Sequence, residues 1–185
     1  MNEPVAIDFS KGIDISISMH PRENAVLAWY AAPLKITPVR GEGFVGAVAE
    51  GGSVNFRDIL FNPHAHGTHT ECLGHITEEV FNLNEVAKPG LFNALLISIT
   101  PELVEGDRVV SYQQLKNAIG ETKPEAIVLR TLPNENTKLA INYSNSNPTY
   151  LDHNAAEWLR ELGVLHLLID TPSVDREEDG GALKA

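Results

Sequence analysis

Apolar and polar residues alternate strictly from Ile13 to Met19, a pattern that predicts a half-buried strand. Two apolar stretches, 44–49 and 54–61, flank a Gly-Gly pair, and this turn signal predicts a hairpin between them. Three shorter apolar runs predict buried strands, and they span residues 95–99, 126–129 and 165–169. The first half of the chain is therefore predicted to be mostly strand.

The second half alternates predicted strands with two predicted helices. One helix begins after Ser111 as N-cap and stops at Gly120. The other begins after Asp152 as N-cap and ends at Gly163. We therefore expect an α/β fold in which a mixed sheet or a barrel-like β core carries flanking helices. A length of 185 residues predicts one domain.

The stretch from Leu132 to Tyr150 has no periodicity and is rich in Asn, Pro, Ser and Thr. Loops longer than about 12 residues are uncommon in compact domains unless they cover a site or are disordered. The composition favours a solvated insertion at this position.

Charge and cysteine content narrow the function classes. The formal net charge is −11, so the surface repels phosphate backbones, and we expect neither nucleic acid nor an anionic membrane as a partner. The sequence has no apolar run near the roughly 20 residues that a membrane-spanning helix needs. A single cysteine is typical of a reducing compartment, which predicts a cytoplasmic protein.

Four of the seven histidines lie within twelve residues: His64, His66, His69 and His75. Glu71 lies among them, and imidazole with carboxylate is the ligand set of zinc, manganese and iron sites. In an extended segment the side chains of His69 and Glu71 lie on one face and can converge on one ion. His75 can approach the same ion without being a ligand.

Cys72 lies inside this cluster and allows a second hypothesis, a thiol nucleophile activated by a neighbouring histidine. The neighbours of Cys72 favour a small buried hydrophobic residue instead.

The spacing of Gly67-Thr68-His69, Glu71 and His75 resembles the histidine motif of the cyclase family of metal-dependent hydrolases, which includes bacterial kynurenine formamidase and isatin hydrolase. Three further segments resemble family segments, and they span 13–16, 129–131 and 169–175. The first histidine of the motif falls on Ala65 here, with His64 and His66 on either side. We prefer His64, because Pro63 stiffens its approach, and keep His66 as the alternative. Glu71 and Leu73 stand where the family has Asp and Pro.

The resemblance implies a swivelling β/β/α fold and a divalent Zn or Mn ion held by His64, His69 and Glu71. It also implies an arylformamidase-like hydrolysis of a small amide or cyclic amide, in which metal-activated water attacks the carbonyl and His75 serves as the base. Relatives of this kind are commonly homodimers or homotetramers, so we expect a homo-oligomer.

Four other residues are candidates for substrate contact or for support of the site: His20, Trp29, Arg130 and Asp170. Each also has a structural explanation. For Arg130 that explanation is a carboxylate partner, for Asp170 the capping of a turn, and for Trp29 core packing.

The resemblance further implies a His and a Glu downstream of residue 175 that complete the site. The sequence ends at Ala185 before such a pair, just after a helix-like start at Ala182. We therefore expect residues 1–185 to form a single cyclase-like domain that lacks its C-terminal part. The alternative function is an inactive or truncated relative that binds metal weakly and does not turn over.

Overall fold

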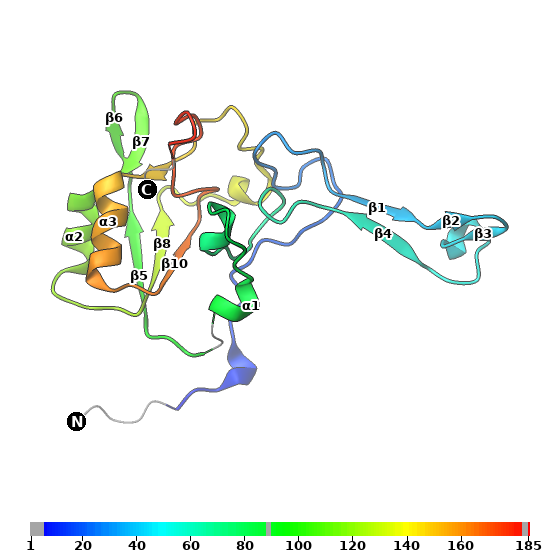
Figure 1. Ribbon diagram of the computed structural model, residues 1–185, viewed down its shortest axis with the longest axis horizontal. Helices are drawn as coiled ribbons and strands as arrows, with labels where there is room; N and C mark the ends of the chain where they lie inside the picture. Colours follow the sequence, from blue (N-terminus) through cyan, green and yellow to red (C-terminus); the bar gives the residue numbers. More distant parts are fainter. Residues whose placement is uncertain (1–5, 88–89, 183–184) are drawn as a thin grey trace.

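The helix-covered sheet of the fold has three parallel strands in the order β10-β8-β5 and lies at the end of the molecule opposite the arm formed by residues 35–61 (Figure 1). The computed structural model describes residues 6–87, 90–182 and 185. The strands of this sheet are β5 (Ala94–Ile99), β8 (Ala126–Thr131) and β10 (His166–Ile169). All three confirm strands predicted from apolar runs. Leu96, Val128 and Leu168 lie side by side in this register.

Both predicted helices are present, α2 (Tyr112–Ile119) and α3 (His153–Leu162), and they cover one face of this sheet (Figure 1). Ser111 caps α2 in a capping box with Gln114, which satisfies two backbone N–H groups reciprocally. Asp152 caps α3, which ends at Gly163 in the left-handed conformation. Local capping chemistry thus fixes both ends of α3 and the start of α2.

The hydrophobic core lies between these helices and the sheet. Its fully buried members include Leu115 from α2, Ile127 and Leu129 from β8, and Ala155 from α3. The amphipathic pattern of each helix is what turns its apolar side chains toward the strands. The core therefore belongs to the second half of the chain.

A second sheet has the order β6-β7-β9 and consists of β6 (Glu102–Val104), β7 (Asp107–Val110) and β9 (Tyr150–Leu151). The predicted loop from 132 to 150 leads into β9 and contains the short helix η4 (Asn136–Ala140). This loop is tied to the body, because Glu177 accepts hydrogen bonds from the backbone N–H groups of Asn145 and Asn147. The sheets in the described residues are open and do not close into a barrel. Of the two predicted cores, the mixed sheet is therefore the one observed.

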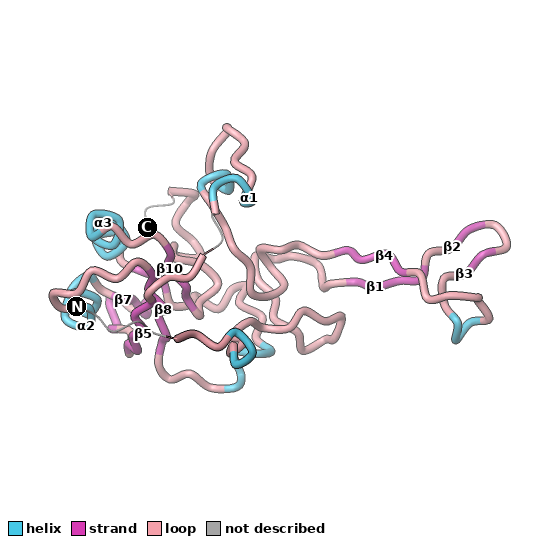
Figure 2. The backbone as a smooth tube through the Cα atoms, turned by 90° about the horizontal axis from the view of Figure 1, so that it is seen from below, coloured by secondary structure: helices cyan, strands magenta, loops and turns pink. Residues whose placement is uncertain are grey.

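Residues 35–61 form an extended arm that projects from the rest of the chain (Figures 1 and 2). Its strands are β1 (Lys35–Pro38), β2 (Arg40–Gly41), β3 (Phe44–Val45) and β4 (Arg57–Leu60). The predicted hairpin between 44–49 and 54–61 is wrong in its pairing, because β4 pairs with β1 and β3 pairs with β2. The Gly-Gly pair instead ends the helix η2 (Val48–Glu50), with Gly51 in the left-handed conformation.

The strand predicted from Ile13 to Met19 is also wrong. This segment has no strand pairing, and the side chains of Ile13 and Ile15 are exposed. Asp14 accepts a hydrogen bond from the backbone N–H of Ser16, a local bond that competes with sheet pairing. The short helix η1 (Phe9–Lys11) precedes this segment.

Residues 183–184 lie outside the described residues, and with them most of the helix-like start expected after Ala182. Within residues 6–87, 90–182 and 185, no helix has the length and apolar character required to cross a bilayer.

Candidate metal centre

The clustered histidines lie on the loop that follows β4 and leads into the short helix η3 (Leu73–His75). Asn62 sets the start of this loop, because its side-chain Oδ1 accepts a hydrogen bond of 2.9 Å from the backbone N–H of His64. Its carbonyl oxygen also accepts from the backbone N–H of Ala65 at 3.1 Å. These Asx-turn bonds hold the backbone around His64.

Three side chains converge on one point: His64, His69 and Glu71. His64 Nδ1 lies 2.5 Å and His69 Nε2 lies 2.9 Å from Glu71 Oε1. One ligand atom from each residue lies within 4.8 Å of the other two. Two imidazoles and a carboxylate are a donor set suited to zinc or manganese, so this cluster can hold a divalent ion.

The orientation of His69 supports this use of its Nε2. His69 Nδ1 lies 2.9 Å from the carbonyl oxygen of Gly67. A carbonyl oxygen only accepts, so Nδ1 carries the proton and Nε2 is left as the ligand atom. Gly67 has φ 149°, and a Cβ atom there would lie 3.2 Å from the carbonyl oxygen of Ile17. The close approach of these two segments therefore requires glycine at this position.

His75 lies beside the three converging side chains, on η3. Its ring stacks on that of His64, with centroids 4.3 Å apart and an interplanar angle of 24°. Its Nε2 is 3.9 Å from Glu71 Oε1. About half of the His75 side chain is exposed. This placement leaves a ring nitrogen next to the cluster and open to solvent, which suits proton exchange.

His66 lies outside the cluster. Its Nδ1 accepts from the backbone N–H of Asn62 at 2.8 Å, and its Nε2 lies 2.9 Å from the carbonyl oxygen of Ala32. Both ring nitrogens are therefore engaged with backbone groups, and only 5 % of the residue is exposed. The structure thus brings His64, and not His66, to His69 and Glu71.

The electrostatics of the cluster favour an ionised Glu71. Burial raises the pKa of Glu71, but its contacts with the ring nitrogens of His64 and His69 and the nearby charge of His75 outweigh burial and lower this pKa below its ordinary value. A carboxylate, rather than a carboxylic acid, is the form that binds a metal ion.

Cys72 lies next to the cluster in sequence but makes a different contact. Its thiol Sγ lies 3.4 Å from the carbonyl oxygen of Phe81 and is partly buried. It is not among the three converging ligands. This placement matches the small hydrophobic role favoured for Cys72 by the sequence.

The four remaining candidates form no hydrogen bond to the cluster within the described residues. Arg130 donates to Ser98 Oγ, and Asp170 accepts from Thr131 and from Lys138. Trp29 has φ 55°, and His20 has a buried Nδ1 without a hydrogen-bond partner. The contacts of Asp170 and Arg130 are those of structural residues.

Three groups that position the histidines were not predicted from the sequence. They are the Asn62 side chain and the carbonyl oxygens of Ala32 and Gly67. The Asn-Pro pair two residues before His64 is a turn signal that identifies Asn62. The Ala32 contact spans 34 positions and carries no local signal.

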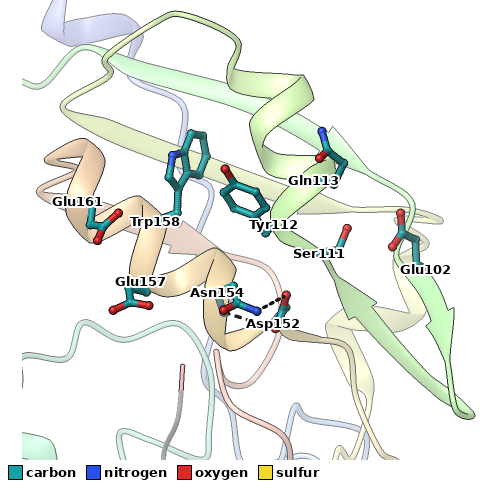
Figure 3. A pocket seen from close by; sticks show the side chains of 9 residues that line it. All are labelled: Glu102, Ser111, Tyr112, Gln113, Asp152, Asn154, Glu157, Trp158 and Glu161. Atoms are coloured by element: carbon teal, nitrogen blue, oxygen red, sulfur yellow. Dashed lines mark hydrogen bonds between the residues drawn. The ribbon is translucent and has the colours of Figure 1, made fainter.

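A shallow hollow lies elsewhere, between α2 and α3 (Figure 3). Tyr112 and Trp158 form an edge-to-face pair in it, and Glu157 and Glu161 line its rim. The Lys116 ammonium already lies 5.2 Å from the centroid of the Tyr112 ring. None of the clustered histidines lines this hollow, so it is separate from the metal cluster.

Comparison with known proteins identifies the family. The model of the Cyclase family matches residues 13–176, which is most of the chain and includes the whole histidine cluster. The chain belongs to the Cyclase family. A comparison with curated proteins found no match.

Proposed function

We propose that this protein is a metal-dependent hydrolase of an amide or cyclic amide, similar to arylformamidases. This proposal rests on one observation: His64, His69 and Glu71 converge on one point in a chain of the Cyclase family. We further propose Zn or Mn as the ion. A small-molecule amide is then the substrate, and an N-formyl or cyclic amide of an aromatic amine is the class that the family resemblance favours.

In this proposal three side chains bind the metal ion and a fourth transfers protons. His64 Nδ1, His69 Nε2 and Glu71 Oε1 would hold the ion. When bound, a divalent ion polarises a carbonyl oxygen and lowers the pKa of water toward neutrality. His75 Nε2 takes the proton from the attacking water and returns it to the leaving nitrogen. The Gly67 carbonyl oxygen keeps the proton of His69 on Nδ1, away from the ion.

Metal content and turnover test this proposal together. We expect the purified protein to bind about one Zn or Mn ion per chain, measured by elemental analysis after dialysis. Glu71→Gln should lower metal affinity by more than the roughly 10- to 100-fold loss typical of an outer-shell partner. His75→Ala should retain the metal and lose hydrolysis of an N-formyl aromatic amine.

His153→Gln on α3 is the matched control, because it also removes an imidazole but lies outside the cluster. It should leave both metal content and turnover unchanged. Turnover that survives His75→Ala would reject the assigned base. Turnover that resists chelators and is lost on alkylation of Cys72 would replace the metal mechanism with a thiol mechanism.

A further inference from the structure

The hollow between α2 and α3 carries side chains that the proposed hydrolase does not use (Figure 3). Its volume is about 560 Å³, within the range of roughly 300–1,000 Å³ that is typical of small-ligand pockets. None of the three converging metal ligands lines it. A molecule bound there would therefore be a second ligand, separate from the metal ion and the amide of the proposed reaction.

Two aromatic rings form a corner in this hollow. The ring centroids of Tyr112 and Trp158 lie 5.5 Å apart, and the ring planes meet at 88°. Figure 3 shows the two side chains next to each other, one from each helix. Two perpendicular ring faces can contact a rounded group on two sides, whereas a planar group can stack on only one of them. The face of an aromatic ring carries partial negative charge, so this corner attracts a cation.

Carboxylates surround the aromatic corner. Four acidic residues line the hollow: Glu102, Asp152, Glu157 and Glu161. No Lys or Arg is among the lining residues that the structure describes. Glu157 and Glu161 lie one turn apart on α3, where like charges repel each other, and only Glu157 has an ion partner there, the exposed Arg160 at 3.5 Å. A cation in the hollow would reduce this repulsion.

The contacts of Lys116 show that this aromatic surface already attracts positive charge. The Lys116 ammonium lies 5.2 Å from the centroid of the Tyr112 ring and donates to the Tyr112 hydroxyl at 3.0 Å. Lys116 does not line the hollow, so the corner between the two rings stays open to a second cation.

An anion fits the hollow less well, although α2 and α3 both begin beside it and helix N-termini attract negative charge. The N-cap side chains already use these helix starts. Ser111 Oγ accepts from the backbone N–H of Gln114. The Asp152 carboxylate accepts from the backbone N–H of Asn154. A backbone donor at each helix start is thus engaged, and the four carboxylates would repel an anion.

We propose that this hollow binds a methylated ammonium group, such as the trimethylammonium group of choline. The methyl groups contact the ring faces of Tyr112 and Trp158, and Glu157 and Glu161 balance the positive charge. A quaternary ammonium has no hydrogen to donate, so ring faces and nearby carboxylates recognise it by charge and shape. This site goes beyond the proposed hydrolase activity and does not depend on the metal cluster.

NMR titration of the full chain with choline tests the proposal. The chain has two tryptophans, so Trp158→Phe assigns the two indole N–H signals. Choline should shift the Trp158 signal saturably, with a Kd of about 1–10 mM, and should leave the Trp29 signal in place. Dimethylbutanol, the neutral analogue of choline with carbon in place of nitrogen, should bind about tenfold more weakly, because it has the shape without the charge.

One pair of variants isolates the contribution of the carboxylates. Glu161→Gln should raise the Kd for choline about threefold or more, because it removes a charge next to the aromatic corner. Glu121→Gln is the matched control, since it removes the same charge from an exposed residue outside the hollow, and it should leave the Kd unchanged. Trp158→Leu should abolish binding. Trp158 packs against the core, so if this variant does not fold, Glu161→Gln provides the test.

Two results would overturn the proposal. One is the absence of a saturable shift up to about 50 mM choline, beyond the range expected for this site. The other is an equal Kd for choline and dimethylbutanol, which would reduce the contact to apolar packing. Acetylated trimethyllysine amide carries the same group as choline, and the tighter binder of the two identifies a protein side chain or a free metabolite as the source. Glu71→Gln should lose metal and keep choline binding, which separates failure of this site from failure of the hydrolase proposal.

Discussion

His64 and His66 flank the same alanine, yet their rings have different partners. His64 meets Glu71 at the cluster, while His66 bonds the backbone at Asn62 and Ala32. The ring of His66 thus joins the loop that carries the clustered histidines to the segment that precedes the arm. Replacement of each residue should separate metal affinity from stability.

We expect His66→Phe to lower the free energy of unfolding of the metal-free protein by about 1–3 kcal/mol, because the backbone groups at Asn62 and Ala32 lose their buried partner. His64→Phe should leave this free energy nearly unchanged and weaken metal binding, since the His64 side chain is 38 % exposed. Urea unfolding and metal titration measure the two effects. A His66→Phe variant with full stability and no metal would make His66 the ligand instead.

At the scale of elements, Asp170 joins three of them at one end of the sheet β10-β8-β5. Its carboxylate accepts from the backbone N–H and the hydroxyl of Thr131 at the end of β8. It also pairs with Lys138 of η4 at 2.7 Å, and both side chains are only about one quarter exposed. β8, β10 and η4 are therefore held together by one charged group.

Asp170→Ala should lower the free energy of unfolding by about 1.5–3 kcal/mol, the range for hydrogen bonds to charged groups, because it removes the acceptor of the Thr131 N–H and the charge partner of Lys138. Glu157→Gln is the control, since it removes an exposed ion pair with Arg160 on α3 and should cost at most about 1 kcal/mol. Chemical denaturation of the two variants gives the comparison. Equal losses would show that the Asp170 cluster adds nothing beyond surface charge.

The two helices with local capping signals were predictable from the sequence. The boundaries of α2 and α3 follow from Ser111, Asp152 and Gly163, whose capping bonds lie within one turn. The pairing of β4 with β1 was not predictable, because it depends on a register between segments about twenty residues apart. At the cluster, spacing brought His69 and Glu71 together, whereas the position of His66 depended on the distant carbonyl oxygen of Ala32.

At the scale of the whole molecule, the segment after β10 contacts both the loop 132–150 and the sheet β6-β7-β9, and so connects them. Asp107 of β7 accepts from Asn147 Nδ2 at 2.7 Å and from the Tyr150 hydroxyl at 2.9 Å. Arg176 Nε lies 2.8 Å from the same carboxylate, whose side chain is 14 % exposed. Three parts of the chain therefore meet at Asp107, and its charge state affects all of them.

The contacts at Asp107 should make the free energy of unfolding depend on pH. The hydrogen bonds from Asn147 and Tyr150, reinforced by the charge of Arg176, hold the pKa of Asp107 below its ordinary value, although burial acts in the opposite direction. A depressed pKa in the folded state means that the contribution of Asp107 is fully present above the unfolded value of about 3.9. This contribution is lost as the pH falls through the lower folded value.

Asp107→Asn should therefore be less stable than the wild-type protein at pH 6, and the difference should shrink as the pH falls below about 4. Denaturation at a series of pH values from 6 to 3 measures this difference. Asp58→Asn on β4 is the control, because its carboxylate lies in the exposed arm. A stability difference for Asp107→Asn that stays constant over this range would mean that shape, and not charge, holds the junction together.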